Sequence, residues 1–194
     1  GFIEKVADGR EQPSHKWAAQ CGGGRGLAVL NDGRYGVAFE GGEIRLAIAR
    51  SALFADHFGS RDELMDYIDI GETELNYALT AFDPDKAEHA DARAELLNMP
   101  VRTLLEGQHK VKLPCTYEGA AISGNTVRVQ AIKRAENGEG FIVRLNETAG
   151  KPARAHMSIP ALDADFDADM RPMGISTYYV KDGKAELTDF VEPD

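Results

Sequence analysis

Three short β-prone runs separated by tight-turn sequences constrain the fold of this chain more than any other feature. The runs cover residues 27–30, 35–39 and 43–49, and the segments between them are Asn31-Asp-Gly-Arg34 and Glu40-Gly-Gly42. Such glycine-containing segments are typical of the reversals that join antiparallel strands. The sequence therefore predicts a three-stranded antiparallel meander whose first turn lies at residues 31–34.

Strand patterns continue after this region. Residues 74–82 alternate Leu75, Tyr77 and Leu79 with smaller or more polar side chains, which is the period of a half-buried strand. We interpret the glycine-rich segment 21–26 as a turn, because a phosphate-binding loop would need a helix after it and here a strand follows.

One short connector helix is expected over residues 85–98. Ala87, Ala90, Ala94 and Leu97 fall near one helical face, and Pro100 stops the helix. Residues 61–67 could add one or two helical turns.

After residue 104 short strands return at even spacing, which favours a β-sandwich. The expected strands are 127–134, 140–146, 154–159, 175–180 and 184–190. The chain is thus predicted to be all-β with one connector helix. We place a domain boundary at residue 112, which divides it into residues 1–112 and 113–194.

Composition excludes several function classes. The formal net charge of -10 disfavours a nucleic-acid partner, because nucleic-acid binding depends on Lys and Arg contacts with phosphates. No run approaches the roughly 18 apolar residues of a membrane span. The two cysteines, Cys21 and Cys115, give no disulfide framework, which favours a cytoplasmic protein. The first residues show no signal peptide pattern. Because the chain starts at Gly1 and not at Met, we expect that a preceding segment has been removed.

No catalytic or metal site is predicted within the chain. The sequence contains no Gly-x-Ser-x-Gly elbow, no P-loop and no cysteine–histidine nucleophile pattern. A glycosidase needs two flanking carboxylates, but 32 acidic residues offer too many chance pairs to nominate one. The histidines lack the short spacings of zinc sites. They are His15, His57, His89, His109 and His156.

The acidic run at residues 163–169 allows two interpretations. Asp163, Asp165 and Asp167 match the first three ligand positions of a calcium loop. Ala168 stands where that loop needs glycine, and Gly174 where it needs a bidentate glutamate. The solvated face of an edge strand is therefore the favoured interpretation.

The first predicted turn is the best candidate for a binding site. Asn31, Asp32 and Arg34 offer hydrogen-bond donors and acceptors suited to sugar hydroxyls, and Tyr35 adds an aromatic ring. The alternative is structural: the Asn-Asp-Gly sequence makes a turn, Gly33 supplies a positive φ, and Tyr35 packs on the sheet. From chemistry alone the structural interpretation is favoured.

A set of residues and short motifs, in this order along residues 11–147, resembles a known family. They are Pro13, Trp17, Leu30-Asn-Asp-Gly-Arg-Tyr-Gly36, Arg50-Ser51, Tyr77-Ala-Leu79, Leu97-Asn98 with Pro100, Lys133-Arg-Ala-Glu136, Arg144 and Glu147. The family is that of the glycoside hydrolase family 38 α-mannosidases. The chain is similar to their C-terminal β region, in the branch that includes cytosolic and bacterial members.

The resemblance implies the end portion of a mutarotase-like supersandwich followed by a smaller β-sandwich. It also implies a retaining α-mannosidase whose zinc ion and catalytic carboxylates lie in an N-terminal barrel, so this chain would hold neither. The expected partners are that missing catalytic domain and mannose-containing glycans. Asn31, Asp32, Arg34 and Tyr35 would border the sugar site, and a homo-oligomer is left open.

Two other functions are retained as alternatives. A free-standing carbohydrate-binding module would need exposed aromatic side chains, for which Trp17, Tyr178 and Tyr179 are the obvious candidates. A purely structural module would bind no glycan. A piece of a larger enzyme should instead expose an apolar face or an unpaired strand edge where its neighbours would pack.

Overall fold

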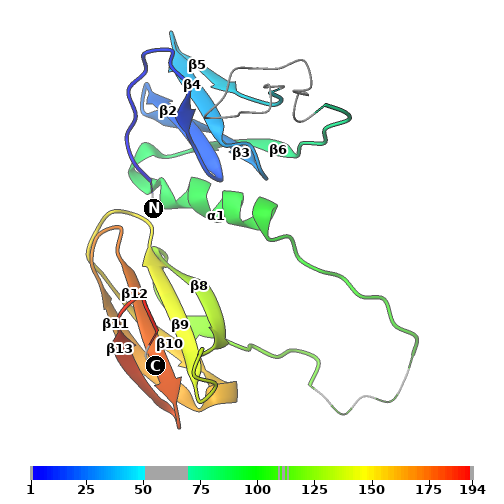
Figure 1. Ribbon diagram of the computed structural model, residues 1–194, viewed down its shortest axis with the longest axis vertical. Coiled ribbons are helices and arrows are strands. Elements are labelled where there is room, and N and C mark those ends of the chain that lie inside the picture. The colour runs from blue at the N-terminus through cyan, green and yellow to red at the C-terminus, as the bar shows by residue number, and fades with distance from the viewer. Residues whose placement is uncertain (1, 51–69, 109, 111, 113, 193–194) are drawn as a thin grey trace, which may run out of the picture. The chain divides into compact units, whose positions relative to one another are not determined.

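The computed structural model describes residues 2–50, 70–108, 110, 112 and 114–192. These residues form two compact units (Figure 1). The first is Lys5–Val101, and the second begins at Arg102 and includes the short N-terminal stretch that ends at Glu4. The predicted boundary at residue 112 lies between α1 and β7, where the described residues form no helix or strand; it stays a prediction. The helical turns predicted over residues 61–67 lie outside the described residues.

The described residues of the first unit form two three-stranded antiparallel sheets and one α-helix. Its elements are β1 (Gln12–Pro13), β2 (Trp17–Gly22), β3 (Arg25–Asn31), β4 (Gly36–Glu40), β5 (Glu43–Leu46), β6 (Tyr77–Phe82), the 3-10 turn η1 (Pro84–Lys86) and α1 (Glu88–Asn98). One sheet has the order β1-β4-β5 and the other β2-β3-β6. Ala18, Val37 and Phe39 form a buried cluster that joins residues of both sheets.

The meander predicted over residues 27–49 is wrong at its first connection. β3 pairs with β2 on one side and β6 on the other, so neither edge is left for β4, which pairs with β1 and β5. Residues 31–35 carry the chain from one sheet to the other. The second predicted hairpin is confirmed, because β4 and β5 are joined at Gly41 and Gly42, both with positive φ.

The glycine-rich segment forms a turn, as predicted. It joins β2 to β3, with Gly23 and Gly24 at positive φ. Gly26 is needed for a different reason, because a Cβ there would lie 2.5 Å from the Phe82 ring. The absence of a side chain at Gly26 leaves room for the Phe82 ring.

Helix α1 lies against the β2-β3-β6 sheet, as Figure 1 shows. Ala90 and Ala94 are fully buried, which confirms the predicted helical face. β6 is confirmed as a strand, but its predicted face is inverted. Thr80 and Phe82 face α1 and are buried, whereas Tyr77 and Leu79 are exposed.

The second unit is a β-sandwich of a three-stranded and a four-stranded antiparallel sheet. Its strands are β7 (Ala121–Ile122), β8 (Val127–Arg134), β9 (Phe141–Glu147), β10 (Ala153–Ile159), β11 (Ala164–Met170), β12 (Ile175–Lys181) and β13 (Lys184–Thr188), with a 3-10 turn η2 (Pro160–Leu162). The strand orders are β11-β10-β7 and β13-β12-β9-β8. Leu145, Met157, Ala168 and Tyr178 lie in the core between the sheets. The all-β fold with one α-helix is therefore confirmed.

The acidic run belongs to an edge strand and not to a calcium loop. Asp165 and Asp167 lie on β11, the edge of its sheet, and Asp163 ends the turn η2 with φ 49°. Alternate positions of β11 point into the core, so Ala164 and Ala168 are buried and the acids between them are solvated. Within the described residues, no helix is both long and apolar enough to cross a bilayer.

Candidate functional site

The candidate site is the connection at residues 31–35, which leaves β3 and enters β4 of the other sheet. It carries all four residues singled out from the sequence, Asn31, Asp32, Arg34 and Tyr35. The structure also brings three residues to it that the sequence did not indicate. These are His15, from the segment before β2, and Glu74 and Asn76, from the segment before β6.

Asn31 is a structural residue. Its side chain is buried, and its amide oxygen accepts hydrogen bonds from the N–H groups of Gly33 at 3.1 Å and Arg34 at 2.6 Å. Its amide nitrogen donates to the carbonyl of His15 at 3.2 Å, and its own carbonyl accepts from the Asn98 side chain at 2.9 Å. Because every polar group is used internally, Asn31 shapes the turn and is not available to a ligand.

Asp32 is exposed and holds the segment before β6. Its carboxylate accepts hydrogen bonds from the Asn76 side chain at 2.8 Å and from the Asn76 backbone N–H at 3.2 Å. The Asn76 side-chain bond lowers the pKa of the Asp32 carboxyl below its usual value, so Asp32 is ionised at neutral pH. The two carboxylate oxygens offer further acceptor positions, so Asp32 can also accept a hydrogen bond from a hydroxyl group.

Arg34 is half-buried beside Asp32. Its guanidinium donates one hydrogen bond to the Glu74 carbonyl at 3.3 Å. A guanidinium has five N–H donors in a planar fork, so this single contact orients the group and leaves donors for a ligand.

Tyr35 is 59% exposed and does not pack on the sheet, contrary to the structural interpretation. Its ring stacks on His15, with centroids 6.0 Å apart and an angle of 26° between the rings. Tyr77 stands opposite Asn31 in the β3–β6 register and is 62% exposed. Two solvent-facing tyrosines are therefore found here, Tyr35 within the connection and Tyr77 at the start of β6.

The backbone at Gly33 also differs from expectation. Gly33 does not have a positive φ, and an added Cβ would meet no atom within 4 Å. The turn is set by the Asn31 side chain, which accepts the two following N–H groups, and not by a left-handed glycine. The expected role of Gly33 is therefore wrong.

The aromatic residues proposed for a binding module are not presented to solvent as such a module would need. Trp17 is half-buried and donates from its indole nitrogen to Asp91 of α1 at 3.1 Å. Tyr178 is buried in the sandwich core and Tyr179 is half-buried. The sequence could not reveal this, because strand alternation alone does not say which face is covered.

Among the described residues, no group of three or more His, Cys, Asp or Glu side chains could hold a metal ion. His15 instead stacks on Tyr35, and His156 pairs with Asp165 and Asp167. The residues described here therefore do not fit a zinc site.

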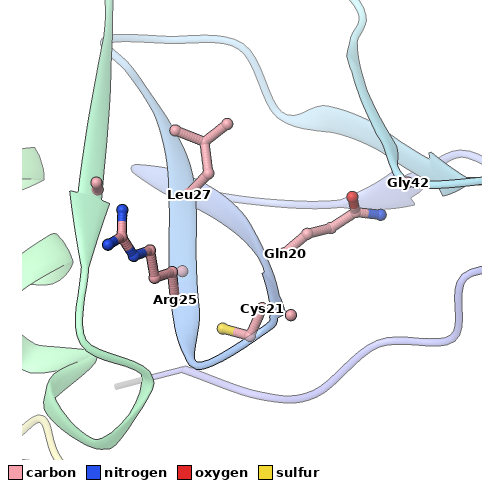
Figure 2. Close-up of a pocket in the computed structure, with 8 residues that line it drawn as sticks. Gln20, Cys21, Arg25, Leu27 and Gly42 are labelled. Atoms are coloured by element: carbon pink, nitrogen blue, oxygen red, sulfur yellow. The ribbon is translucent and has the colours of Figure 1, made fainter.

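A pocket of about 420 Å³ lies at the opposite end of β3 from the candidate site (Figure 2). Gln20, Cys21, Arg25 and Leu27 contribute side chains to its lining. Both cysteines are exposed and unpaired. The pocket holds none of the four candidate residues.

Comparison with known proteins places these features in a family context. The family model described as "Glycosyl hydrolases family 38 C-terminal domain" matches residues 1–58, which include the whole connection at 31–35. The human protein Alpha-mannosidase 2C1 is 27% identical over 186 residues, which are 90% of this chain and 16% of the relative.

Two solved structures share the fold. One is an α-mannosidase from Enterococcus faecalis V583, with a TM-score of 0.73 and 16% identity over 90% of this chain and 22% of that chain. The other is a glycosyl hydrolase family 38 protein from Enterococcus faecalis, with a TM-score of 0.71 and 15% identity over 89% of this chain and 23% of that chain. The chain spans less than a quarter of each relative. The resemblance predicted from the sequence is confirmed: this chain is similar to the C-terminal β region of the glycoside hydrolase family 38 α-mannosidases.

Proposed function

We propose that this chain is the C-terminal, non-catalytic part of an α-mannosidase that hydrolyses terminal α-mannosides. It supports the catalytic barrel and forms one wall of the sugar site. The observation that carries this proposal is the share of each protein that the alignment with the human relative covers. A human α-mannosidase aligns with 90% of the chain, yet the aligned part is only 16% of that relative.

An exposed apolar face on the β2-β3-β6 sheet is consistent with a contact between this chain and the catalytic barrel. Leu27, Tyr77 and Leu79 are 51%, 62% and 63% exposed, and the strand register places all three on the face away from α1. Large apolar side chains gathered on one sheet face usually mark a contact surface. We infer that this face packs against the rest of the parent enzyme.

The connection at residues 31–35 supports the role as a wall of the sugar site. Arg34 keeps guanidinium donors beyond its bond to Glu74, and the Asp32 carboxylate is ionised beside it. Sugar hydroxyls both donate and accept, and exposed tyrosine rings such as Tyr35 suit the apolar face of a pyranose. We therefore assign Asp32, Arg34 and Tyr35 to mannoside binding, with Asn31 holding the turn.

The zinc ion of the parent enzyme would be held outside this chain. The described residues form no group of ligands that fits it. When bound in the parent, zinc would orient the hydroxyls of the sugar, while this chain contributes hydrogen bonds only. We place the parent in the cytoplasm, where exposed free thiols such as Cys21 and Cys115 stay reduced.

The test is Arg34→Ala in the full-length parent enzyme. Loss of a charge-assisted hydrogen bond to the sugar should lower kcat/KM about ten- to a hundredfold with an aryl α-mannoside. The melting temperature should be unchanged, because the side chain has one backbone contact. Arg10→Ala is the matched control. The Arg10 side chain is 86% exposed, and its ion pair with Asp8 is a loose one at 3.6 Å.

Two results would overturn the proposal. Unchanged kinetics with a lowered melting temperature in Arg34→Ala would make the residue structural. Clear hydrolysis of the same substrate by the pure 194-residue chain would mean that the chain carries its own active site.

A free-standing carbohydrate-binding module remains the second candidate, because Tyr35 and Tyr77 are exposed close to polar side chains. Binding of mannose-containing glycans by the isolated chain would favour it. An enzyme part that forms only one wall should bind such glycans far more weakly alone than in the parent.

A further inference from the structure

The outer face of the four-stranded sheet in the second unit carries an unexpected contact with the segment after β13. In β9, Val143 and Leu145 point into the core between the sheets, so the alternate residues Ile142 and Arg144 face outward. Ile142 is nevertheless fully buried. A fully buried isoleucine on an outer face needs a cover.

Two contacts hold the segment after β13 against this face, at residues close to Ile142. The Arg144 guanidinium lies 4.2 Å from the centre of the Phe190 ring and donates to the Phe190 carbonyl at 3.2 Å. The Glu192 carboxylate lies 2.5 Å from the Lys133 ammonium and accepts the Glu136 backbone N–H at 2.9 Å. Lys133 stands directly opposite Ile142 in the β8–β9 register.

The two contacts differ in burial, and the contact made by Glu192 is the more deeply buried one. The Glu192 side chain is only 5% exposed although it lies after the last strand, whereas Phe190 is 63% exposed. A carboxylate so well covered must be paired, and here an ammonium and a backbone N–H satisfy it. The hydrogen bond from Lys133 also lowers the pKa of the Glu192 carboxyl, so the pair is ionised at neutral pH.

We propose that the outer face of β8 and β9 is a binding surface for a peptide segment with an aromatic residue two positions before a carboxylate. Residues 190–192 of this chain occupy it in cis. Arg144 holds the aromatic ring and one carbonyl, while Lys133 and the Glu136 N–H hold the carboxylate. This proposal does not depend on the α-mannosidase assignment. Lys133, Glu136 and Arg144 are among the residues that carry the family resemblance, but that assignment gives them no binding or catalytic function.

The cis contact has a direct reporter. The Glu136 amide donates to Glu192, whereas its neighbours in the same turn bond within the turn, Ala135 to the Gly140 carbonyl and Gly138 to the Ala135 carbonyl. In Glu192→Gln, hydrogen exchange of the Glu136 amide should therefore accelerate about tenfold. Exchange at Ala135 and Gly138 should not change. Equal acceleration at all three amides, or none at Glu136, would overturn the cis contact.

The trans site is tested after the surface has been emptied. A tethered segment competes at an effective concentration in the millimolar range, so free peptide binds poorly to the unmodified chain. In Phe190→Ala/Glu192→Gln, the blocked peptide Thr-Asp-Phe-Val-Glu should shift the amide NMR signals of Ile142, Arg144 and Thr177 in a saturable way. The same peptide with Gln for Glu should bind about tenfold more weakly.

Lys133→Met and Lys184→Met, added separately to that background, form the matched pair. Both lysines belong to the same four-stranded sheet, but only Lys133 contacts Glu192. Lys133→Met should weaken peptide binding about tenfold, and Lys184→Met should leave it unchanged. Equal weakening by the two would indicate general charge attraction, and no shifts at millimolar peptide would exclude the site; either result overturns the proposal.

Discussion

At the scale of single residues, Glu147 at the end of β9 is the most constrained charged group in the second unit. It is fully buried, and its carboxylate accepts four backbone N–H groups, from Ala149, Gly150, Lys151 and Met173, at 2.8 to 3.2 Å. It therefore joins the β9–β10 turn to the β11–β12 turn. Burial raises the pKa of this carboxyl, but the four N–H donors outweigh it, and the net shift is downward.

Glu147→Gln should lower the free energy of unfolding by about 2–4 kcal/mol, because the amide nitrogen would face N–H groups and lose the charge-assisted bonds. The difference from wild type should be full above about pH 4.5, the usual Glu value, and should shrink as the pH falls through the lowered folded-state pKa. Urea unfolding at pH 7 and pH 3 measures both. Glu139→Gln, at an exposed pair with Lys181, should cost far less stability than Glu147→Gln at either pH.

Two glycines of the first unit give an opposed pair of predictions. Gly33→Ala should be neutral or stabilise by up to about 1 kcal/mol, because φ is not positive and the added methyl group meets no atom within 4 Å. Gly26→Ala should destabilise by about 1–3 kcal/mol, because its Cβ would lie 2.5 Å from the Phe82 ring. Thermal unfolding of the two variants separates them, and a larger loss at Gly33 would contradict the turn geometry described here.

The sequence could nominate the candidate residues but could not assign their roles. Asn31 and Asp32 are chemically alike as acceptors, yet Asn31 is buried within the turn and Asp32 is exposed. The difference arises from contacts with His15, Asn76 and Asn98, which lie 16 to 67 residues away in sequence. Local patterns contain no information on contacts of that range.

At the scale of elements, β6 shows how tertiary packing decides a strand's faces. Its alternation correctly predicted a strand but pointed to Leu75, Tyr77 and Leu79 as the inner face. In the structure α1 covers the other face, where Thr80 hydrogen-bonds Arg93 of the helix and Phe82 packs edge-on against Trp17. Periodicity gives the spacing of the faces, whereas the position of α1 decides which one is buried.

The β10–β11 pair carries a ladder of charges that should titrate near neutral pH. In the strand register, Arg154 stands opposite Asp169 and His156 stands opposite Asp167. The His156 ring also lies 3.1 Å from the Asp165 carboxylate, and Arg154 forms an ion pair with Asp167. The Asp167 hydrogen bond, followed by the Asp165 charge, raises the pKa of His156 above its usual value of 6.5.

NMR titration of the unmodified chain should therefore give a His156 pKa above 6.5, and Asp167→Asn should move it back toward that value. Asp169→Asn is the control, because Asp169 contacts Arg154 and not His156. The ladder's contribution to stability should be present below about pH 6.5 and lost as the pH rises through the raised pKa. A His156 pKa at or below 6.5 would contradict the pairing.

At the scale of the whole molecule, most of the strands were predictable from the sequence, whereas their division into sheets was not. Turn sequences at Gly41-Gly42 and around Gly138 correctly indicated hairpins, because a hairpin is a local structure. The step from β3 to β4 joins different sheets, and its Asn-Asp-Gly sequence resembles a hairpin turn. β4 cannot pair with β3, because β6 takes that edge of β3 through a pairing that spans 46 residues, from Asn31 to Tyr77.

The apolar face formed by Leu27, Tyr77 and Leu79 should behave differently in the isolated chain and in the parent enzyme. Each of these side chains is at least half exposed, so Leu27→Ser/Leu79→Ser should change the free energy of unfolding of this chain by less than about 1 kcal/mol. If the face is covered in the parent enzyme, the same substitutions should destabilise the parent by about 2–3 kcal/mol, because covering the exposed part of two leucine side chains contributes about half of their full transfer free energy.

Urea unfolding of both proteins, followed in the parent by loss of α-mannosidase activity, measures this difference. Leu187→Ser on the edge strand β13 is the control, because its side chain is 69% exposed and lies in the other unit. An equal and small effect in both proteins would show that the face stays open in the parent. A large effect in the isolated chain would show instead that Leu27 and Leu79 belong to its own core, and the proposed supporting role would lose this argument.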